Sequence, residues 1–302
     1  MYNSFSIKVP GSSANLGPGF DSVGIALGLY LTLEVELSDR WRITTTSPEL
    51  QQLSKAESHF IFNVAKIVSR KYGIKIPPCS IKMNTSIPLA RGLGSSAAAI
   101  VAGIELADQL GHLQLTQQEK LQIATEIEGH PDNVGASLYG GLVIGSYFKN
   151  EVHLLSFSEL DFEVVGCIPN STLLTSESRK VLPSGLGYKE AVAASSVANL
   201  LIASLLSQNW IIAGKMMEND LFHQPYRKDL IPFYDQFEKV AKKNGAFGVA
   251  LSGAGPTLLA FIEKGQAIRL KQSLTESFPQ SNIQLLPIDR KGSQVYKKNA
   301  IL

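Results

Sequence analysis

Residues Pro88-Leu-Ala-Arg-Gly-Leu-Gly-Ser-Ser-Ala-Ala-Ala99 carry the strongest structural signal in this chain. Gly92 and Gly94 can adopt backbone angles closed to other residues, and they leave room for a ligand. Ser95 and Ser96 are good helix-capping residues, and the alanines after them favour a first helical turn. The free N–H groups and partial positive charge of such a turn predict a phosphate site. A tight turn into a buried helix, without any ligand, is the alternative for this stretch alone.

The stretch 88–99 does not match the sequence patterns of two common phosphate-binding loops. A P-loop needs Gly-x-x-x-x-Gly-Lys-Ser/Thr, which occurs nowhere in the chain. A dinucleotide fingerprint needs Gly-x-Gly-x-x-Gly and a later acid for the ribose. The stretch instead resembles the Pro-x-x-x-Gly-Leu-Gly-Ser-Ser-Ala motif of the GHMP kinase family. Val9-Pro-Gly-Ser-Ser-Ala-Asn-Leu-Gly-Pro-Gly-Phe-Asp21 and Leu251-Ser-Gly-Ala-Gly-Pro-Thr257 resemble that family's other two signatures, in the same order.

The resemblance covers nearly the whole chain and is strongest to the branch of the family that phosphorylates L-homoserine. It implies an α+β, two-domain GHMP kinase fold. The N-terminal domain is expected to resemble domain 2 of ribosomal protein S5, and the C-terminal domain to be ferredoxin-like, with the active site between them. A polar stretch at 149–151 places the boundary between residues 1–155 and 156–302.

Composition narrows the class of protein. The 302 residues are 44% hydrophobic, enough for two folded domains, and the net charge of +2 without a basic block argues against nucleic-acid binding. Cys79 and Cys167 read as buried or free thiols, and no metal-ligand cluster is visible. The N-terminus does not resemble a signal peptide, and no apolar run reaches the ~18 residues of a membrane span. We expect a cytoplasmic protein without a membrane partner, and a homodimer is one option.

Apolar periodicity and turn residues predict the elements. A loop rich in Gly and Pro is expected at 10–22, and Thr116 with Glu119 predicts a capping box. Strands are expected at 5–9, 23–37, 41–47, 81–86, 140–146, 162–169, 248–251 and 258–262, and helices from Phe60 to Gly73 and at 95–110, 116–128, 188–207, 209–219 and 229–244.

Phosphoryl transfer from ATP needs a phosphate cradle, a divalent cation and a positioned hydroxyl. The predicted cradle consists of Pro88, Leu89, Ala90, Arg91, Gly92, Leu93, Gly94, Ser95, Ser96, Ala97 and Ala98, with the charge of Arg91 as additional support. By resemblance, Ser96 and a glutamate just before His130 share Mg²⁺. Glu128 is the candidate and Glu126 the reserve. Because they lie two residues apart on a helix, at most one is expected to reach the metal.

The cluster His130-Pro-Asp132-Asn133 follows that glutamate. Some relatives use an aspartate in this region as a base, whereas the homoserine-specific branch is thought to rely on positioning. A loose transition state places little charge on the attacking oxygen, which makes positioning sufficient. We therefore predict that Asp132 and Asn133 orient the acceptor and that His130 contacts it.

An amino-acid acceptor requires an acid for its ammonium and arginines for its carboxylate. By resemblance, Asn15 and Asp21 hold the ammonium and the reacting hydroxyl, with Asn15 near the catalytic centre. Thr175 and Arg179 have a spacing that places both on one face of a helix. Arg227 is the second predicted carboxylate clamp, and the loop around Gly253 approaches from the second domain. A surface ion pair is the alternative role for both arginines.

The predicted activity is ATP-dependent formation of O-phospho-L-homoserine, on the route to threonine. Two other functions compete with it: a family member acting on another small alcohol of the mevalonate or methylerythritol type, and a nucleotide-binding sensor without turnover.

Overall fold

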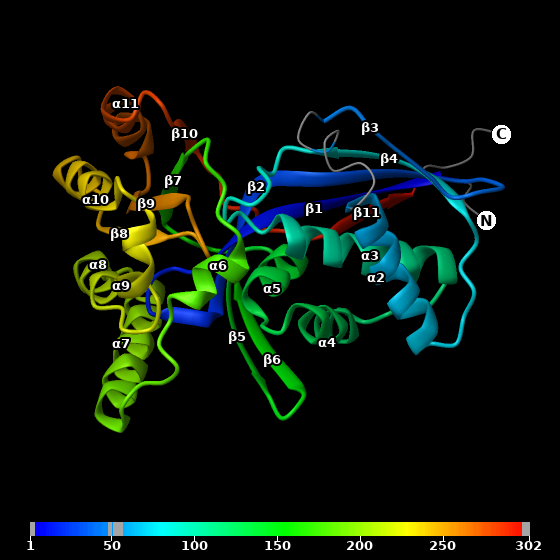
Figure 1. Ribbon diagram of the computed structural model, residues 1–302, viewed down its shortest axis with the longest axis horizontal. Coiled ribbons are helices and arrows are strands. Elements are labelled where there is room, and N and C mark those ends of the chain that lie inside the picture. The colour runs from blue at the N-terminus through cyan, green and yellow to red at the C-terminus, as the bar shows by residue number, and fades with distance from the viewer. Residues whose placement is uncertain (1–3, 48–49, 51–56, 298–302) are drawn as a thin grey trace.

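The computed structural model describes residues 4–47, 50 and 57–297. Two sheets lie side by side along the long axis, and each carries its own helices (Figure 1). In the first sheet the order is β11-β1-β2-β4-β3, with β5 on β2 and β6 on β5. Its strands are β1 (Ser4–Asn15), β2 (Gly19–Leu37), β3 (Arg42–Thr45), β4 (Cys79–Thr85), β5 (Leu142–Phe148), β6 (Glu151–Phe157) and β11 (Gln294–Lys297).

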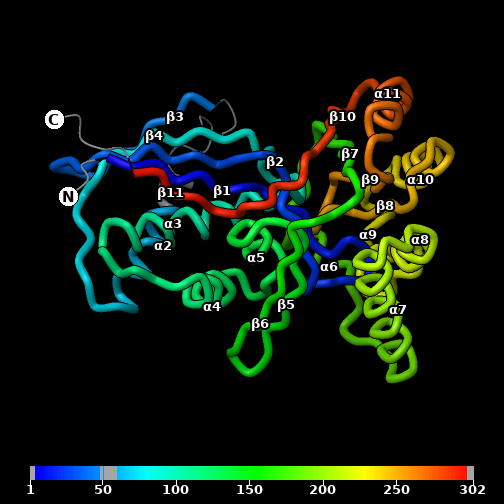
Figure 2. Tube along the Cα trace, turned by 180° about the vertical axis from the view of Figure 1, so that it is seen from behind, coloured from blue at the N-terminus to red at the C-terminus, as the bar shows by residue number. Residues whose placement is uncertain are grey.

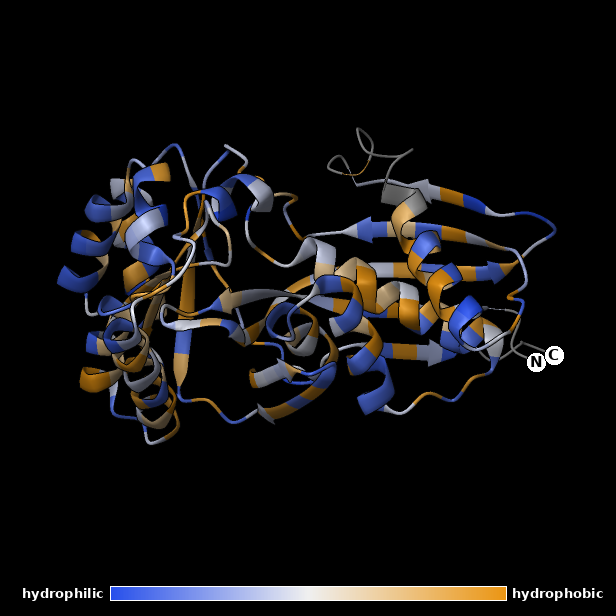
Figure 3. Cartoon of the chain, turned by 60° about the horizontal axis from the view of Figure 1, so that its bottom comes forward, coloured by the Kyte–Doolittle hydropathy of each residue, from blue (hydrophilic) through white to orange (hydrophobic). Residues whose placement is uncertain are grey.

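Helices cover one face of this sheet: α2 (Glu57–Lys71), α3 (Ser95–Gly111), α4 (Gln117–Glu128) and α5 (Asp132–Tyr139). Alternate residues of β1, such as Ile7 and Val9, are buried together with the alanines of α3. Figure 3 shows apolar residues along the strands and along the helices that lie against them. The predicted capping box of Thr116 and Glu119 is present at the start of α4.

The second sheet has the order β10-β7-β9-β8 and is antiparallel throughout. Its strands are β7 (Phe162–Ile168), β8 (Gly248–Leu251), β9 (Leu258–Glu263) and β10 (Asn282–Leu285). Alternation along β7 buries Val165 with the helices α10 and α11, and Phe162 with the aromatic side chains beside α8. The helices of this half are α6 (Thr175–Lys180), α7 (Tyr188–Leu206), α8 (Trp210–Glu218), α9 (Gln224–Arg227), α10 (Tyr234–Lys243) and α11 (Ala267–Ser277), with a 3₁₀ turn at Lys228–Leu230.

The region expected as a loop at 10–22 is mostly a β-hairpin, so that expectation is wrong. Strand β1 continues to Asn15 and β2 begins at Gly19, with register shifts after Pro10 and Ala14. The glycines and proline of this stretch hid the strand because they lower strand propensity. The hairpin carries Asn15 and Asp21 to the middle of the molecule.

The chain crosses the predicted boundary once more near its end. Strand β11 pairs with β1 in antiparallel fashion, from Phe5 opposite Lys297 to Lys8 opposite Gln294. Figure 2 shows this last strand running beside β1, next to the N-terminal half. The predicted division at 155/156 lies inside β6, which belongs to the first sheet and ends at Phe157, and residues 294–297 also belong to that sheet.

No apolar run of about 18 residues was expected, and α7 is the one helix of the described residues that is long and apolar enough to cross a membrane. It has 19 residues, and its composition would also permit a span. Its charged residues, Lys189 and Glu190, lie in the first turn, and Ala194, Leu201 and Leu205 are buried. One such helix is weak evidence for a span, because a mostly buried core helix passes the same test, although only 22% of this stretch of α7 is buried.

Candidate active site

Hydrogen bonds join the three sequence signatures to one another. The Ser252 hydroxyl donates to the Gly92 carbonyl at 2.6 Å, and the Ser12 amide donates to the Leu93 carbonyl at 3.1 Å. The Gly253 amide donates to the Ala14 carbonyl at 3.2 Å. Segments about 80 and 160 residues apart in sequence therefore meet around one cavity of about 260 Å³.

The glycine loop forms the wall of this cavity. Gly92 and Gly94 have φ of +72° and +71°, and a Cβ at Gly94 would lie 2.2 Å from the Ser12 Oγ. Gly94 itself precedes α3 in a left-handed conformation without a side-chain cap. Ser95 and Ser96 are therefore first-turn residues and not the predicted caps. The N–H groups of this turn have no partner within the helix, which leaves them for an anion.

The predicted cradle residues divide between two cavities. Leu89 lines a second, more apolar cavity of about 340 Å³ that shares Ser95 and Ser96 with the first. Ala98 is buried in the core, and Pro88 begins the loop. The remaining residues line the first cavity: Ala90, Arg91, Gly92, Leu93, Gly94, Ser95, Ser96 and Ala97.

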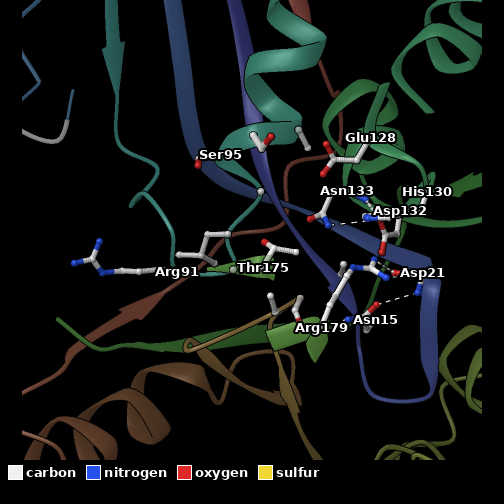
Figure 4. A pocket seen from close by; sticks show the side chains of 18 of the residues that line it. Asn15, Asp21, Arg91, Ser95, Glu128, His130, Asp132, Asn133, Thr175 and Arg179 are labelled. Atoms are coloured by element: carbon white, nitrogen blue, oxygen red, sulfur yellow. Dashed lines mark hydrogen bonds and ion pairs between the residues drawn. The ribbon is translucent and has the colours of Figure 1, made fainter. Parts of the chain in front are cut away.

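The guanidinium of Arg91 does not support the loop as expected. It donates to the carbonyls of Leu89, Pro169 and Asn170 at 2.8–2.9 Å. Figure 4 shows the side chain pointing away from the other labelled residues. Arg91 therefore ties the loop to the second half of the chain, and its charge lies outside the cradle.

The two candidate glutamates have different environments. Glu126 forms an ion pair with Lys71 at 2.8 Å and accepts from Gln122, on the side of α4 that faces α2. Glu128 lines the main cavity, and among residues 4–47, 50 and 57–297 no hydrogen bond or ion pair to it is found. Burial raises its pKa, with Asp132 adding to the effect and His130 and Arg179 opposing it. A half-buried carboxylate without a partner among the described residues fits a divalent cation, so Glu128 stays the predicted ligand.

His130, Asp132 and Asn133 lie together beside Glu128 (Figure 4). Asp132 Oδ1 is 2.6 Å from His130 Nδ1 and accepts from the Asn133 amide at 2.6 Å. Its Oδ2 is buried and finds no hydrogen-bond partner in the described part of the chain. Burial opposes the charge of His130, but the hydrogen bond and the carboxylates of Asp132, Asp21 and Glu128 outweigh it and raise the pKa.

Asn15 and Asp21 shape the end of the cavity opposite α3. Both have positive φ, +76° and +53°, and such strain is common at functional sites. Asn15 Oδ1 accepts from the Asp21 amide at 3.0 Å, and its Nδ2 donates to the Gly253 carbonyl at 3.3 Å. Asp21, His130 and Asp132 each bring one polar atom within 4.8 Å of the others.

The predicted arginines face this acidic group. Arg179 forms a two-point ion pair with Asp21, at 2.7 and 3.2 Å. It lies on α6 together with Thr175, which also lines the cavity. Arg179 is exposed, so the pair has the exposure of the predicted surface ion pair, but it lies at the cavity and its partner is a predicted site residue.

Arg227 is 2% exposed and has no carboxylate within ion-pair distance in the described residues. It donates to the carbonyls of Ser178 and Gly253, at 3.2 and 3.1 Å. Burial and the charge of Arg179 lower its pKa to about 10, so it remains charged at neutral pH. A buried cation without a counter-ion, lining a cavity, is suited to an anionic group of a ligand.

Several residues of the site were missed in the sequence. Ser12 and Ser252 form hydrogen bonds with the glycine loop, Phe20 lies against both guanidinium groups, and His223 contacts Arg227. Phe20 could have been predicted, because it lies inside the first signature and next to Asp21. His223 lies four residues before Arg227, so it lies on the same side of one helical turn.

Comparisons with known proteins agree with this geometry. Residues 59–141 match the GHMP kinases N-terminal domain and residues 201–280 match the GHMP kinases C-terminal domain. The chain therefore belongs to the GHMP kinase family, and the predicted two-domain fold is confirmed.

Within this family the similarity is to homoserine kinases. The homoserine kinase of Bacillus velezensis is 50% identical over 291 residues, which cover 96% of this chain and 94% of that protein. That of Bacillus licheniformis is 48% identical, covering 98% and 96%. The crystal structure of the homoserine kinase from Cytophaga hutchinsonii superposes with a TM-score of 0.86 at 27% identity, covering 98% of each chain.

Proposed function

We propose that this protein transfers the γ-phosphoryl group of ATP to the side-chain hydroxyl of L-homoserine and forms O-phospho-L-homoserine. One observation carries the proposal. A single cavity joins the start of helix α3 to an acid, Asp21, and two arginines, Arg179 and Arg227. The zwitterionic end of an amino acid needs this charge pattern, whereas mevalonate lacks an ammonium and galactose lacks both charges.

The arrangement of the two cavities supports the position of ATP. Triphosphate oxygens would accept from the first-turn N–H groups of α3, beside Gly92 and Gly94. The apolar cavity that shares Ser95 and Ser96 would take the adenine. Apart from Thr85, which is polar, and the shared serines, its lining is apolar: Leu31, Leu50, Phe60, Ile61, Met83, Ile87, Leu89 and Ala99.

Mg²⁺ would be held by Ser96 and Glu128, where it would offset the charge of the phosphates. The protein's own residues then position the acceptor. Arg179 and Arg227 would bind the carboxylate, and Asp21 with Asn15 the ammonium. Asp132 Oδ2 is free to accept a hydrogen bond from the hydroxyl, since Oδ1 is already occupied. Asn133 is fixed by the Ser12 hydroxyl at 3.0 Å, so it would orient and not react.

The reaction would take place in the cytoplasm, where ATP is supplied. The test is a screen for phosphorylated product, by ³¹P NMR, with ATP, Mg²⁺ and one acceptor at a time. Homoserine should give product, and serine, mevalonate and galactose far less. Preference for another alcohol would point to a different member of the family. Binding of ATP and homoserine without product would point to a sensor.

A further inference from the structure

A buried histidine lies behind the second arginine. His223 is fully buried on the turn that begins α9. Its Nδ1 is 3.3 Å from Arg227 Nη1, and its Nε2 is 2.9 Å from the Gly17 carbonyl. Arg227 can only donate and a carbonyl can only accept. Both contacts are therefore satisfied by one form of the ring, the neutral tautomer with its hydrogen on Nε2.

The charges around the ring agree with this form. Burial lowers the pKa of His223 to about 4; Arg227 adds to this, while Asp220, Gly17 and Asp21 oppose it. Asp220 Oδ2 lies 3.3 Å from Nε2, but the Asp220 carboxylate also caps the turn. It accepts from the amides of Phe222, His223 and Gln224 at 2.7–3.3 Å. Asp220 therefore fixes the turn without requiring a charged imidazole.

Phe20 connects this neutral histidine to the charged residues of the site. Its ring stacks on His223, with centroids 5.3 Å apart and an angle of 21°. The guanidinium carbons of Arg179 and Arg227 lie 5.6 and 5.3 Å from the same ring centroid, within cation–π range. Phe20 directly precedes Asp21, and Gly17 belongs to the turn of the same hairpin. Phe20 and His223 together therefore contact this hairpin and both arginines.

We propose that His223 is a positioning residue: it accepts a hydrogen bond from Arg227, donates one to Gly17, and so sets the distance between the arginine and the hairpin that carries Asp21. This inference rests on the proposed function, because that distance matters only if one ligand spans both ends. If His223 sets this distance, the enzyme should select an acceptor that carries its ammonium and its carboxylate on one carbon.

Two amide substitutions separate the two contacts of the ring. In His223→Asn the amide oxygen can occupy the place of Nδ1 and accept from Arg227. In His223→Gln the amide nitrogen can occupy the place of Nε2 and donate to Gly17, while the acceptor for Arg227 is lost. We expect the Gln variant to raise KM for homoserine about tenfold, the loss of one charge-assisted hydrogen bond, with kcat and KM for ATP little changed. The Asn variant should lie closer to the wild type.

Equal shifts of KM in the two variants, or parallel losses in kcat and in KM for ATP, would overturn the positioning role. Wild-type protein that makes no phosphohomoserine would overturn the proposed function instead, so the two failures are distinguishable.

A measurement on the wild type covers the case in which neither variant folds. Imidazole ¹⁵N NMR distinguishes the tautomers among the five histidines. One ring should keep its hydrogen on Nε2 and an unprotonated Nδ1 from pH 7 to pH 5, without titrating. A titrating signal for every histidine in this interval, or a hydrogen on Nδ1 of the buried ring, would contradict the inference.

Discussion

Asp21 and Arg179, 158 residues apart in the chain, form a two-point ion pair across the cavity, with Nη2 to Oδ1 at 2.7 Å. In the proposed function the first residue binds an ammonium and the second a carboxylate. Without substrate they satisfy each other, and a zwitterionic amino acid would exchange this pair for two new ones. A ligand with one charge would break the pair and leave one residue unmatched.

Arg179→Ala should therefore raise KM for homoserine about tenfold to a hundredfold, because a charge-assisted contact is worth about 1.5–3 kcal/mol. KM for ATP should change little. Arg290→Ala is the matched control, since Arg290 pairs with Glu159 on the surface at 3.4 Å. Steady-state kinetics with each substrate varied in turn provides the measurement. An equal rise in both KM values would count against the assignment.

Gly94→Ala should lower stability and raise KM for ATP. Residue 94 has a φ of +71°, and the added Cβ would lie 2.2 Å from the Ser12 Oγ, so the loop must move. Gly73→Ala is the control: φ is +64°, but no atom of the described residues lies within 4 Å of its Cβ. It should cost only about 1–2 kcal/mol of left-handed strain. Urea denaturation and ATP titration distinguish them, and identical effects of the two variants would refute the packing argument.

Glu128→Gln should raise the Mg²⁺ concentration needed for half-maximal activity severalfold, because a charged oxygen ligand is lost. Glu126→Gln should leave it unchanged, since Glu126 is engaged with Lys71. Burial raises the pKa of Glu128, so apparent Mg²⁺ affinity should also weaken as the solution becomes mildly acidic. A stronger effect from Glu126→Gln would reverse the choice between them.

Stability should depend on pH through His223. Its pKa is about 4 in the folded protein and about 6.5 when unfolded, so unfolding takes up a proton between these values. The free energy of unfolding should therefore fall as the pH drops from about 6.5 toward 4. His223→Gln should reduce this dependence, measured by urea denaturation at pH 7 and pH 5. His130 has a raised pKa and acts in the opposite direction, equally in both proteins. The same slope in both would contradict the prediction.

Local patterns in the sequence were enough to predict the glycine loop and the helices α3, α4 and α7, and the resemblance of three motifs to the GHMP kinases predicted the family fold. Contacts between distant residues could not be predicted in this way. Nothing local in the chain shows that Arg91 contacts Pro169 or that β11 returns to β1. The choice between Glu126 and Glu128 required the direction of each side chain. His223 was missed because its proposed role depends on contacts of its ring with Gly17 and Arg227, and Gly17 is distant in sequence.

The most direct test is a crystal structure with a non-hydrolysable ATP analogue and L-homoserine. We predict the triphosphate at the start of α3, the amino-acid carboxylate between Arg179 and Arg227, and its ammonium on Asp21. A triphosphate bound elsewhere, or homoserine held with its carboxylate away from both arginines, would contradict the account.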